Sequence, residues 1–215
     1  MKLCIFSCVI AKYPKSAELD DIVRIMRSSL KLRKLCEEYR KYDAQGDRQG
    51  KLRIKRKETP AFVPSSLLFE GKAHRNIIGL TDLCFMDIDG INEEQINGAM
   101  KLLREDEHVV LAMRSMSGKG LHFLIRYCFK DREQPQITNM SYIRMSLTYS
   151  AVFNTLSLHY SNILNLPIDV SCRNATHTCN ISYDEDLYYN PDAIPYTLIY
   201  EHQKVGKKHK ILEIV

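Results

Sequence analysis

The chain lacks the patterns that mark membrane, secreted and repeat proteins. No apolar run is long enough to cross a bilayer, and no internal repeat or low-complexity linker is present. Residues 1–10 are largely apolar, but with a single leading lysine and no small-residue cleavage pattern they predict a first strand rather than a signal peptide. The seven cysteines are scattered and form no Cys-x-x-Cys pair. Such cysteine usage is typical of a reducing, cytoplasmic location.

Two common ligand-binding motifs are also missing, and a third is incomplete. Lys119 follows a glycine, but neither the Walker spacing nor the Ser or Thr of a P-loop is present. Asp87 does not begin a calcium-binding loop, because Gly98 occupies the twelfth position, where such a loop needs a glutamate. One loose cluster contains three residue types that bind zinc, Cys172, His177 and Cys179. A zinc site would need a fourth ligand and tighter spacing, so zinc binding is kept only as an alternative.

What the chain does contain is an ordinary globular composition. Its 215 residues are 45% hydrophobic and 27% charged, which is enough for one good core and a small flanking lobe. The formal net charge of +5 is compatible with a polyanionic partner but does not require one. Composition therefore bounds the fold class without selecting a function.

The apolar segment that stops at Gly90 carries two aspartates on one face. Asp87 and Asp89 alternate with Met86 and Ile88, and side chains two residues apart in a strand share a face. Two like charges so placed repel each other and lose hydration when they are partly buried. A divalent cation removes both penalties. The pair therefore predicts a metal site, with an ion-free Asp-x-Asp-Gly turn as the alternative.

Two further segments carry polar groups that are suited to phosphate or metal chemistry. In residues 117–122 two glycines flank Lys119, which lets backbone amides approach an anion, and His122 follows inside the next expected strand. Asp169 lies between two apolar residues, where a carboxylate is costly unless it is paired or bound to a metal. Taken alone, His122 is more typical of a core or interface position, and Asp169 of an ion pair with Arg173 or a turn cap.

Apolar periodicity and capping residues predict an α+β fold with a mainly antiparallel sheet. Ser16 is expected to cap a helix that ends at the glycines of residues 46–50. The basic residues 51–57 predict an edge strand or a loop with a cationic, phosphate-facing side, and Asn92 with Gln95 predicts a capped helix start. The other expected elements are a long helix near residues 139–164 and strands near residues 79–89, 109–113, 121–127, 168–171 and 180–183.

The order of these motifs resembles the archaeo-eukaryotic primase superfamily. Within it, the chain is most similar to the VirE N-terminal-domain family of primase-like proteins of bacterial and mobile-element replication modules. The resemblance extends from about residue 51 to residue 195, and its specificity lies in the order and spacing of short motifs. The matching pieces are Lys57 with Pro60, residues 86–90, residues 117–122, Asp169 with Arg173, residues 181–184 and residues 188–193.

The resemblance implies a primase-polymerase core built on an RNA-recognition-motif-like (RRM-like) sheet, which uses nucleoside triphosphates and one or two Mg²⁺ or Mn²⁺ ions. The implied metal ligands are Asp87, Asp89 and Asp169. The implied nucleotide-binding residues are Ser117, Lys119, His122 and Arg173. His122 and the three aspartates would form the catalytic group, because two ions can activate a 3′-hydroxyl and stabilise the leaving pyrophosphate.

These features predict a nucleotidyltransferase that acts on a single-stranded DNA template. We expect an N-terminal α/β element over residues 1–78, a catalytic RRM-like core over 79–195 and a basic tail over 196–215. Relatives often continue into a helicase or P-loop ATPase, so a helicase or ATPase partner is expected. The alternatives are a non-catalytic, replication-associated DNA-binding module and a metal-dependent single-strand nuclease in which His122 would act as a base.

Overall fold

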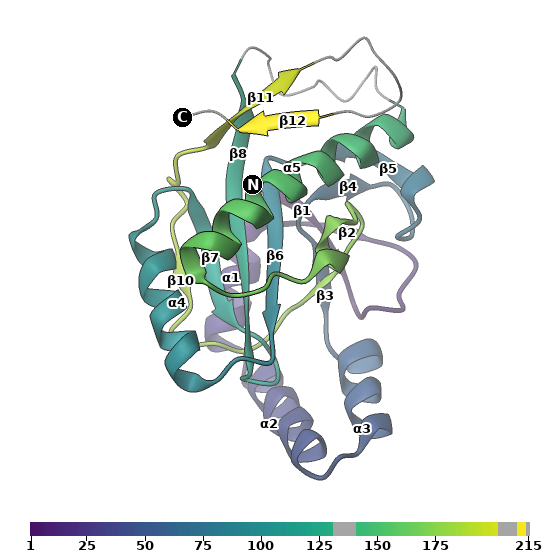
Figure 1. Ribbon diagram of the computed structural model, residues 1–215. Helices are drawn as coiled ribbons and strands as arrows, with labels where there is room; N and C mark the ends of the chain where they lie inside the picture. Colours follow the sequence, from purple (N-terminus) through teal and green to yellow (C-terminus); the bar gives the residue numbers. More distant parts are fainter. Residues whose placement is uncertain (131–140, 202–209, 214–215) are drawn as a thin grey trace.

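The computed structural model describes residues 1–130, 141–201 and 210–213. It shows an α+β protein with mainly antiparallel sheets, as the sequence predicts (Figure 1). Most of the basic C-terminal stretch, residues 204–209, lies outside the described part. None of the described helices is both long enough and apolar enough to pass through a lipid bilayer.

The central sheet has the strand order of an RRM-like, split β-α-β unit. β6 (Leu83–Asp89) leads through α4 (Glu93–Glu105) to β7 (Val109–Arg114), and β7 turns directly into β8 (Gly120–Phe129). Both β6 and β7 pair antiparallel with β8, which therefore lies between them. The long helix α5 (Tyr142–Leu164) follows β8 in the described chain. This order brings the Asp-x-Asp strand next to the strand that carries the expected histidine.

Three later strands extend this sheet. β10 (Tyr188–Tyr189) pairs antiparallel with β7, and β11 (Tyr196–Glu201) pairs in parallel with the end of β8. β12 (Lys210–Glu213) pairs with β11. The start of the stretch that we expected to be a basic tail is therefore a strand of the main sheet.

A second sheet joins the N-terminal part to the core. It consists of β1 (Lys2–Phe6), β2 (Lys15–Glu18), β3 (Ala61–Val63) and β9 (Cys179–Asn180), in the order β2-β1-β3-β9. β9 belongs to the segment expected as the core, residues 79–195, while the other three strands belong to the N-terminal segment, residues 1–78. The two expected segments therefore share one sheet. β4 (Ser66–Leu68) and β5 (Ile77–Leu80) form a hairpin around the short 3₁₀ helix His74–Asn76.

The N-terminal helices differ from the prediction. Ser16 lies in β2, and the expected single helix is divided into α1 (Leu19–Ser28) and α2 (Leu30–Ala44), because the Ser29 side chain accepts a hydrogen bond from the Leu32 amide and caps a new helix. The prediction of a strand or loop over residues 51–57 is wrong. These residues continue α3 (Arg48–Arg53), which Asp47 caps, into a single π-helical turn, Ile54–Glu58.

Two later elements were also tested by the structure. The capping box of α4 is confirmed, because the Asn92 and Gln95 side chains each accept a hydrogen bond from the other residue's backbone amide. The expected strand near residues 168–171 is wrong. Asp169 instead caps a short 3₁₀ helix, Val170–Arg173, because its carboxylate accepts hydrogen bonds from the Ser171 amide and hydroxyl.

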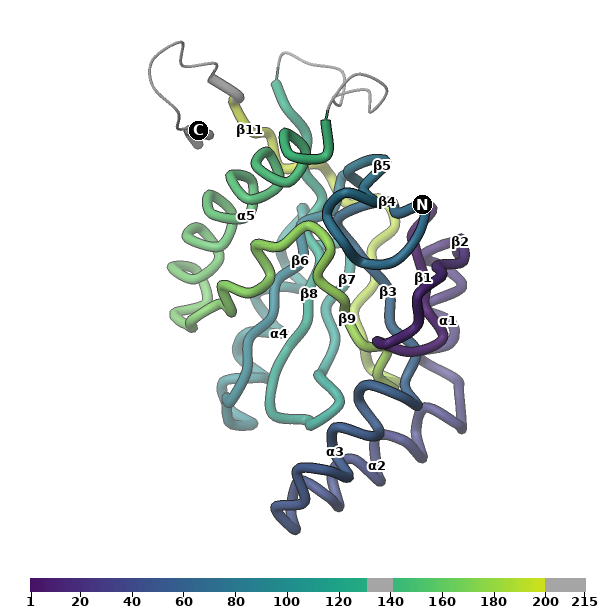
Figure 2. The backbone as a smooth tube through the Cα atoms, turned by 90° about the vertical axis from the view of Figure 1, so that its right-hand side faces the viewer, coloured from purple at the N-terminus to yellow at the C-terminus, as the bar shows by residue number. Residues whose placement is uncertain are grey.

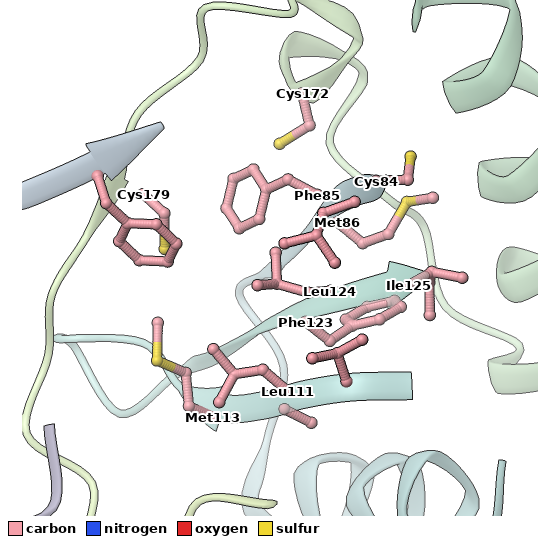
Figure 3. Close-up of a cluster of buried hydrophobic side chains, with 14 of the residues drawn as sticks. Cys84, Phe85, Met86, Leu111, Met113, Phe123, Leu124, Ile125, Cys172 and Cys179 are labelled. Atoms are coloured by element: carbon pink, nitrogen blue, oxygen red, sulfur yellow. The ribbon is translucent and has the colours of Figure 1, made fainter. Parts of the chain in front are cut away.

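The central sheet lies between two layers. α4 and α5 cover one face, and β1–β3 with α1 lie on the opposite side (Figure 2). Phe123 of β8 packs edge-on against Tyr160 of α5, with ring centroids 5.7 Å apart, so its neighbour His122 points to the opposite face. Tyr149 of α5 is fully buried and its hydroxyl accepts a hydrogen bond from the Phe85 amide. Figure 3 shows part of this core, where Phe85 and Phe123 belong to one cluster with Cys172 and Cys179.

Candidate active site

Strand pairing brings together the first two predicted residues. Asp87 of β6 lies directly opposite His122 of β8, and Asp89 lies opposite Gly120. His122 Nε2 is 3.3 Å from Asp87 Oδ1, and only 11% and 12% of the two side chains are exposed. The pair therefore forms a largely buried ion pair on the sheet face that α5 does not cover.

The third predicted aspartate reaches the same place by a backbone contact. The amide of Asp169 donates a hydrogen bond of 2.8 Å to the carbonyl oxygen of Asp87. This contact places the 3₁₀ helix that Asp169 caps alongside the end of β6. A carboxylate oxygen of Asp87, one of Asp169 and the sulfur of Cys172 all lie within 4.8 Å of one another. The predicted convergence of Asp87 and Asp169 from distant parts of the chain is present in the structure.

One oxygen of this group is buried without a well-formed hydrogen bond. The ion-pair contact of Asp87 Oδ1 with His122 Nε2 at 3.3 Å lacks hydrogen-bond geometry, and no other described residue donates to this oxygen. A buried carboxylate oxygen without a donor is costly, and a cation would compensate for that cost. Two carboxylates fit Mg²⁺ or Mn²⁺, and the Cys172 thiol is a ligand that softer ions accept better than Mg²⁺ does. The residues present therefore fit a divalent cation.

Asp89 lies at the edge of this group rather than inside it. It is exposed at the end of β6 and is not one of the three clustered donors. Partial burial raises its pKa, and the nearby carboxylates of Asp87 and Asp169 raise it further. Asp89 therefore adds to the negative potential of the site, and a cation bound there would favour its ionised form.

His122 is held between an acid and a thiol. Its Nδ1 lies 3.5 Å from the sulfur of Cys179, while its Nε2 faces Asp87. Burial alone would lower the pKa of His122, but Cys179 and Asp87 outweigh burial and raise the pKa well above its usual value. For Asp87, burial opposes ionisation, but His122, Lys55 and His177 together lower the pKa. Both shifts favour an imidazolium next to a carboxylate.

The glycine-rich hairpin between β7 and β8 places its lysine away from this pair. Gly118 has a φ of 73°, a conformation that glycine adopts without strain, and the Ser117 hydroxyl accepts a hydrogen bond from the Lys119 amide. The ammonium of Lys119 forms a 2.7 Å salt bridge with Asp43 of α2. Asp43 also binds Lys51 at 2.6 Å. Lys119 therefore connects the hairpin to the N-terminal helices, and a bound triphosphate would have to compete with Asp43 for it.

Arg173 is a predicted nucleotide-binding residue that the structure leaves without a polar side-chain partner among the described residues. It is exposed at the end of the 3₁₀ helix that begins after Asp169, and its side chain forms no hydrogen bond or salt bridge with residues 1–130, 141–201 or 210–213. Its side chain is therefore available to a ligand, but the structure gives it no fixed direction.

A cavity opens beside the Asp87–His122 pair. It has a volume of about 330 Å³ and is lined by residues of the sheet face opposite α5 and of the π-helical turn of the N-terminal part. Phe85 forms one wall and contacts His122 edge-on, with ring centroids 5.6 Å apart, while it stacks on His177 at 5.8 Å. The lining residues are Val9, Leu52, Lys55, Arg56, Phe85, Asp87, His122, His177, Thr178 and Asn180.

A sequence comparison identifies the family. The profile described as "BT4734-like, N-terminal domain" matches residues 53–189, which include the π-helical turn, both β6 aspartates, His122 and Asp169. The chain belongs to this family. No curated protein and no solved structure matches it.

Within this BT4734-like domain, sequence reasoning missed several residues of the site. Cys172, His177 and Cys179 were considered only as zinc ligands, yet Cys172 lies with the two aspartates and Cys179 contacts His122. Lys55 and Arg56 were visible only as members of a basic run. The signals were present in the sequence, but only the packing of distant segments shows which neighbours each residue has.

The salt bridges of Asp43 in the BT4734-like domain predict a pH effect. Hydrogen bonds from Lys119 and Lys51 lower the pKa of Asp43 from 3.8 to about 2. Ionised Asp43 therefore stabilises the fold fully above pH 3.8, and this contribution is lost as the pH falls through 2. We expect Asp43→Asn to lower the urea unfolding midpoint at neutral pH, with a difference from wild type that narrows between pH 3.8 and 2.

The control is Asp21→Asn, which removes a carboxylate from a solvent-exposed pair with Arg24 on α1. It should show no comparable change with pH. A wild-type-to-Asp43→Asn difference that stays constant across this range would contradict the assignment.

Proposed function

We propose that this BT4734-like domain is a primase-polymerase-like nucleotidyltransferase of the archaeo-eukaryotic primase type, which extends or starts strands on single-stranded DNA. The proposal depends on one observation. The buried Oδ1 of Asp87 accepts no well-formed hydrogen bond and lies beside the carboxylate of Asp169 and the imidazole of His122, at the edge of a cavity with cationic walls. The RRM-like strand order supports the same proposal, since the resemblance in sequence implies such a sheet.

The residues of the site would have two roles, metal binding and neutralisation of phosphate charge. Asp87 and Asp169 would bind Mg²⁺ or Mn²⁺, with Asp89 adding negative charge at the rim. When bound, the ion would supply Lewis-acid stabilisation of the phosphoryl group and of the leaving pyrophosphate. His122, kept protonated by Asp87 and Cys179, would act through its positive charge and neutralise charge that develops on the phosphoryl group, since its two ring nitrogens already face Cys179 and Asp87.

A second hollow next to the cavity would bind the template strand. This larger hollow, of about 750 Å³, shares Leu52 and Arg56 with the cavity and also includes Arg53 and Lys57. Cations along an open surface suit a phosphate backbone. We therefore place the single-stranded DNA template across this hollow.

We also propose a location and a protein partner. The seven unpaired cysteines agree with a reducing, cytoplasmic location, and a helicase or ATPase is the proposed partner.

The test is incorporation of labelled nucleotides by the purified chain on a single-stranded template, with Mg²⁺ or Mn²⁺. We expect extension that depends on the template and on the metal. Cleavage of the strand without any triphosphate would instead identify a nuclease. Retained DNA binding with no incorporation under either metal would identify a DNA-binding module that has lost the chemistry.

A further inference from the structure

The π-helical turn lines the site cavity and contributes the only lysine and the only arginine among its lining residues. Lys55 and Arg56 are consecutive in this turn and both line the cavity. Both side chains are exposed, and neither forms a salt bridge with any described residue. The only carboxylate in the lining is Asp87, which lies at the sheet end of the cavity. The wall formed by the turn is therefore open to an anionic ligand.

The backbone of the turn is fixed on both sides. Ile54 is fully buried, and its carbonyl oxygen accepts hydrogen bonds from both the amide and the hydroxyl of Thr59. The carbonyl oxygen of Lys55 accepts a 2.8 Å hydrogen bond from Asn180 of β9, and that of Arg56 accepts one from the Ile10 amide. A π-helical turn is rare and is frequently found at functional sites. Here it fixes the backbone of two cationic residues relative to the sheet.

The position of these cations matches the distribution of charge that a nucleoside triphosphate requires. Lys55 lines the same cavity as Asp87 and lies close enough to act electrostatically on the carboxylates of both Asp87 and Asp89. Phosphates that bridged a cation on Asp87 would therefore extend toward the turn. The volume of about 330 Å³ is at the lower end of small-ligand pockets, which suits the phosphate tail of a nucleotide rather than a nucleic-acid strand.

We propose that Lys55 and Arg56 bind the triphosphate of the incoming nucleotide in this cavity. This inference rests on the proposed function and changes its expected residues. The phosphate-binding role moves from Lys119, which is engaged by Asp43, to the π-helical turn. Arg56 provides a planar group for bidentate contacts, while Lys55 provides a point charge next to the metal end of the tail.

The experiment measures binding of inorganic triphosphate to the full chain by calorimetry, in the presence of Mg²⁺. We expect Lys55→Gln and Arg56→Gln each to weaken binding about tenfold, because each removes a charge-assisted contact. Lys55→Arg should retain most of the affinity. The control is Arg48→Gln, the same charge change at an exposed position of α3 outside both hollows, and it should alter the affinity less than about twofold.

A parallel titration with a single-stranded oligothymidylate separates the two possible sources of phosphate. If Lys55→Gln and Arg56→Gln weaken oligonucleotide binding but leave triphosphate binding unchanged, the turn contacts the template and the inference is wrong. Equal losses in Arg48→Gln and Lys55→Gln would also overturn it, since they would show a general charge effect. Neither result affects the wild-type incorporation test, so the inference can fail while the proposed function holds.

Discussion

Replacing Asp87 by asparagine is expected to reduce nucleotide incorporation about a thousandfold or more. The substitution keeps the size of the side chain but removes the negative charge that would bind the ion and that pairs with His122. A metal ion contributes several kcal/mol to phosphoryl transfer, and each 1.36 kcal/mol changes the rate about tenfold. The rate is measured as labelled nucleotide incorporated per minute on a single-stranded template.

Asp21→Asn is the matched control for this prediction. It makes the same change at an exposed position of α1, where the partner Arg24 is also exposed, and it should leave the incorporation rate unchanged. Far-UV circular dichroism of both variants shows whether the fold is retained. Wild-type rates in a folded Asp87→Asn variant would remove Asp87 from the chemistry.

The second large effect is expected at Gly120. A β-carbon at this position would collide with the carbonyl oxygen of Ile88 across the β6–β8 pair, and it would also crowd the Asp89 carboxylate. We expect Gly120→Ala to destabilise the protein by about 1–3 kcal/mol, the usual cost of overpacking. Because the collision lies between Asp87 and Asp89, incorporation should fall as well. Urea unfolding and the incorporation rate measure the two effects.

Gly98 provides a control with the opposite sign. It is exposed in α4, and a β-carbon there would meet no atom within 4 Å. Gly98→Ala should therefore stabilise the protein by about 0.5–1 kcal/mol, because alanine has the higher helix propensity. If the two alanine variants shifted the unfolding midpoint equally, the close approach of β6 and β8 at Gly120 would be refuted.

The central part of the fold could be predicted because its signals are local. The apolar run that ends at Asp89, the capping pair Asn92 and Gln95, and the glycine-rich hairpin before His122 lie in consecutive segments. Together they predict strand, helix and hairpin in the order that the structure shows. The α+β class followed from that order and did not depend on any single motif.

The elements that were predicted wrongly depend on specific hydrogen bonds or on distant partners. The strand expected near residues 168–171 is a 3₁₀ helix, because the Asp169 carboxylate binds the next turn and its amide binds Asp87. The basic run at residues 51–57 is helical, since Asp47 caps it and Thr59 closes its last turn. Periodicity alone does not report either kind of contact.

The residues of the candidate site also fall into those that could be predicted from the sequence and those that could not. Carboxylates between apolar residues are unusual, so Asp87 and Asp169 could be selected from the sequence and are found together. The neighbours that modify them could not be selected, because Cys172, Cys179 and Lys55 come from three separate segments with ordinary local patterns. Lys119 is the opposite case, a residue that the sequence selected but that the structure places elsewhere. Its glycine-rich segment predicted a phosphate site, yet its ammonium forms a salt bridge with Asp43 of α2.

The most direct measurement is a titration of the metal-free protein with Mn²⁺, followed by the decrease of the free-ion signal in electron paramagnetic resonance. We expect saturable binding by the wild-type chain, loss of that binding in Asp87→Asn and in Asp169→Asn, and no change in Asp21→Asn. Wild-type protein that leaves the free Mn²⁺ signal undiminished, or Asp169→Asn protein that binds as tightly as wild type, would contradict a metal site formed by Asp87 and Asp169.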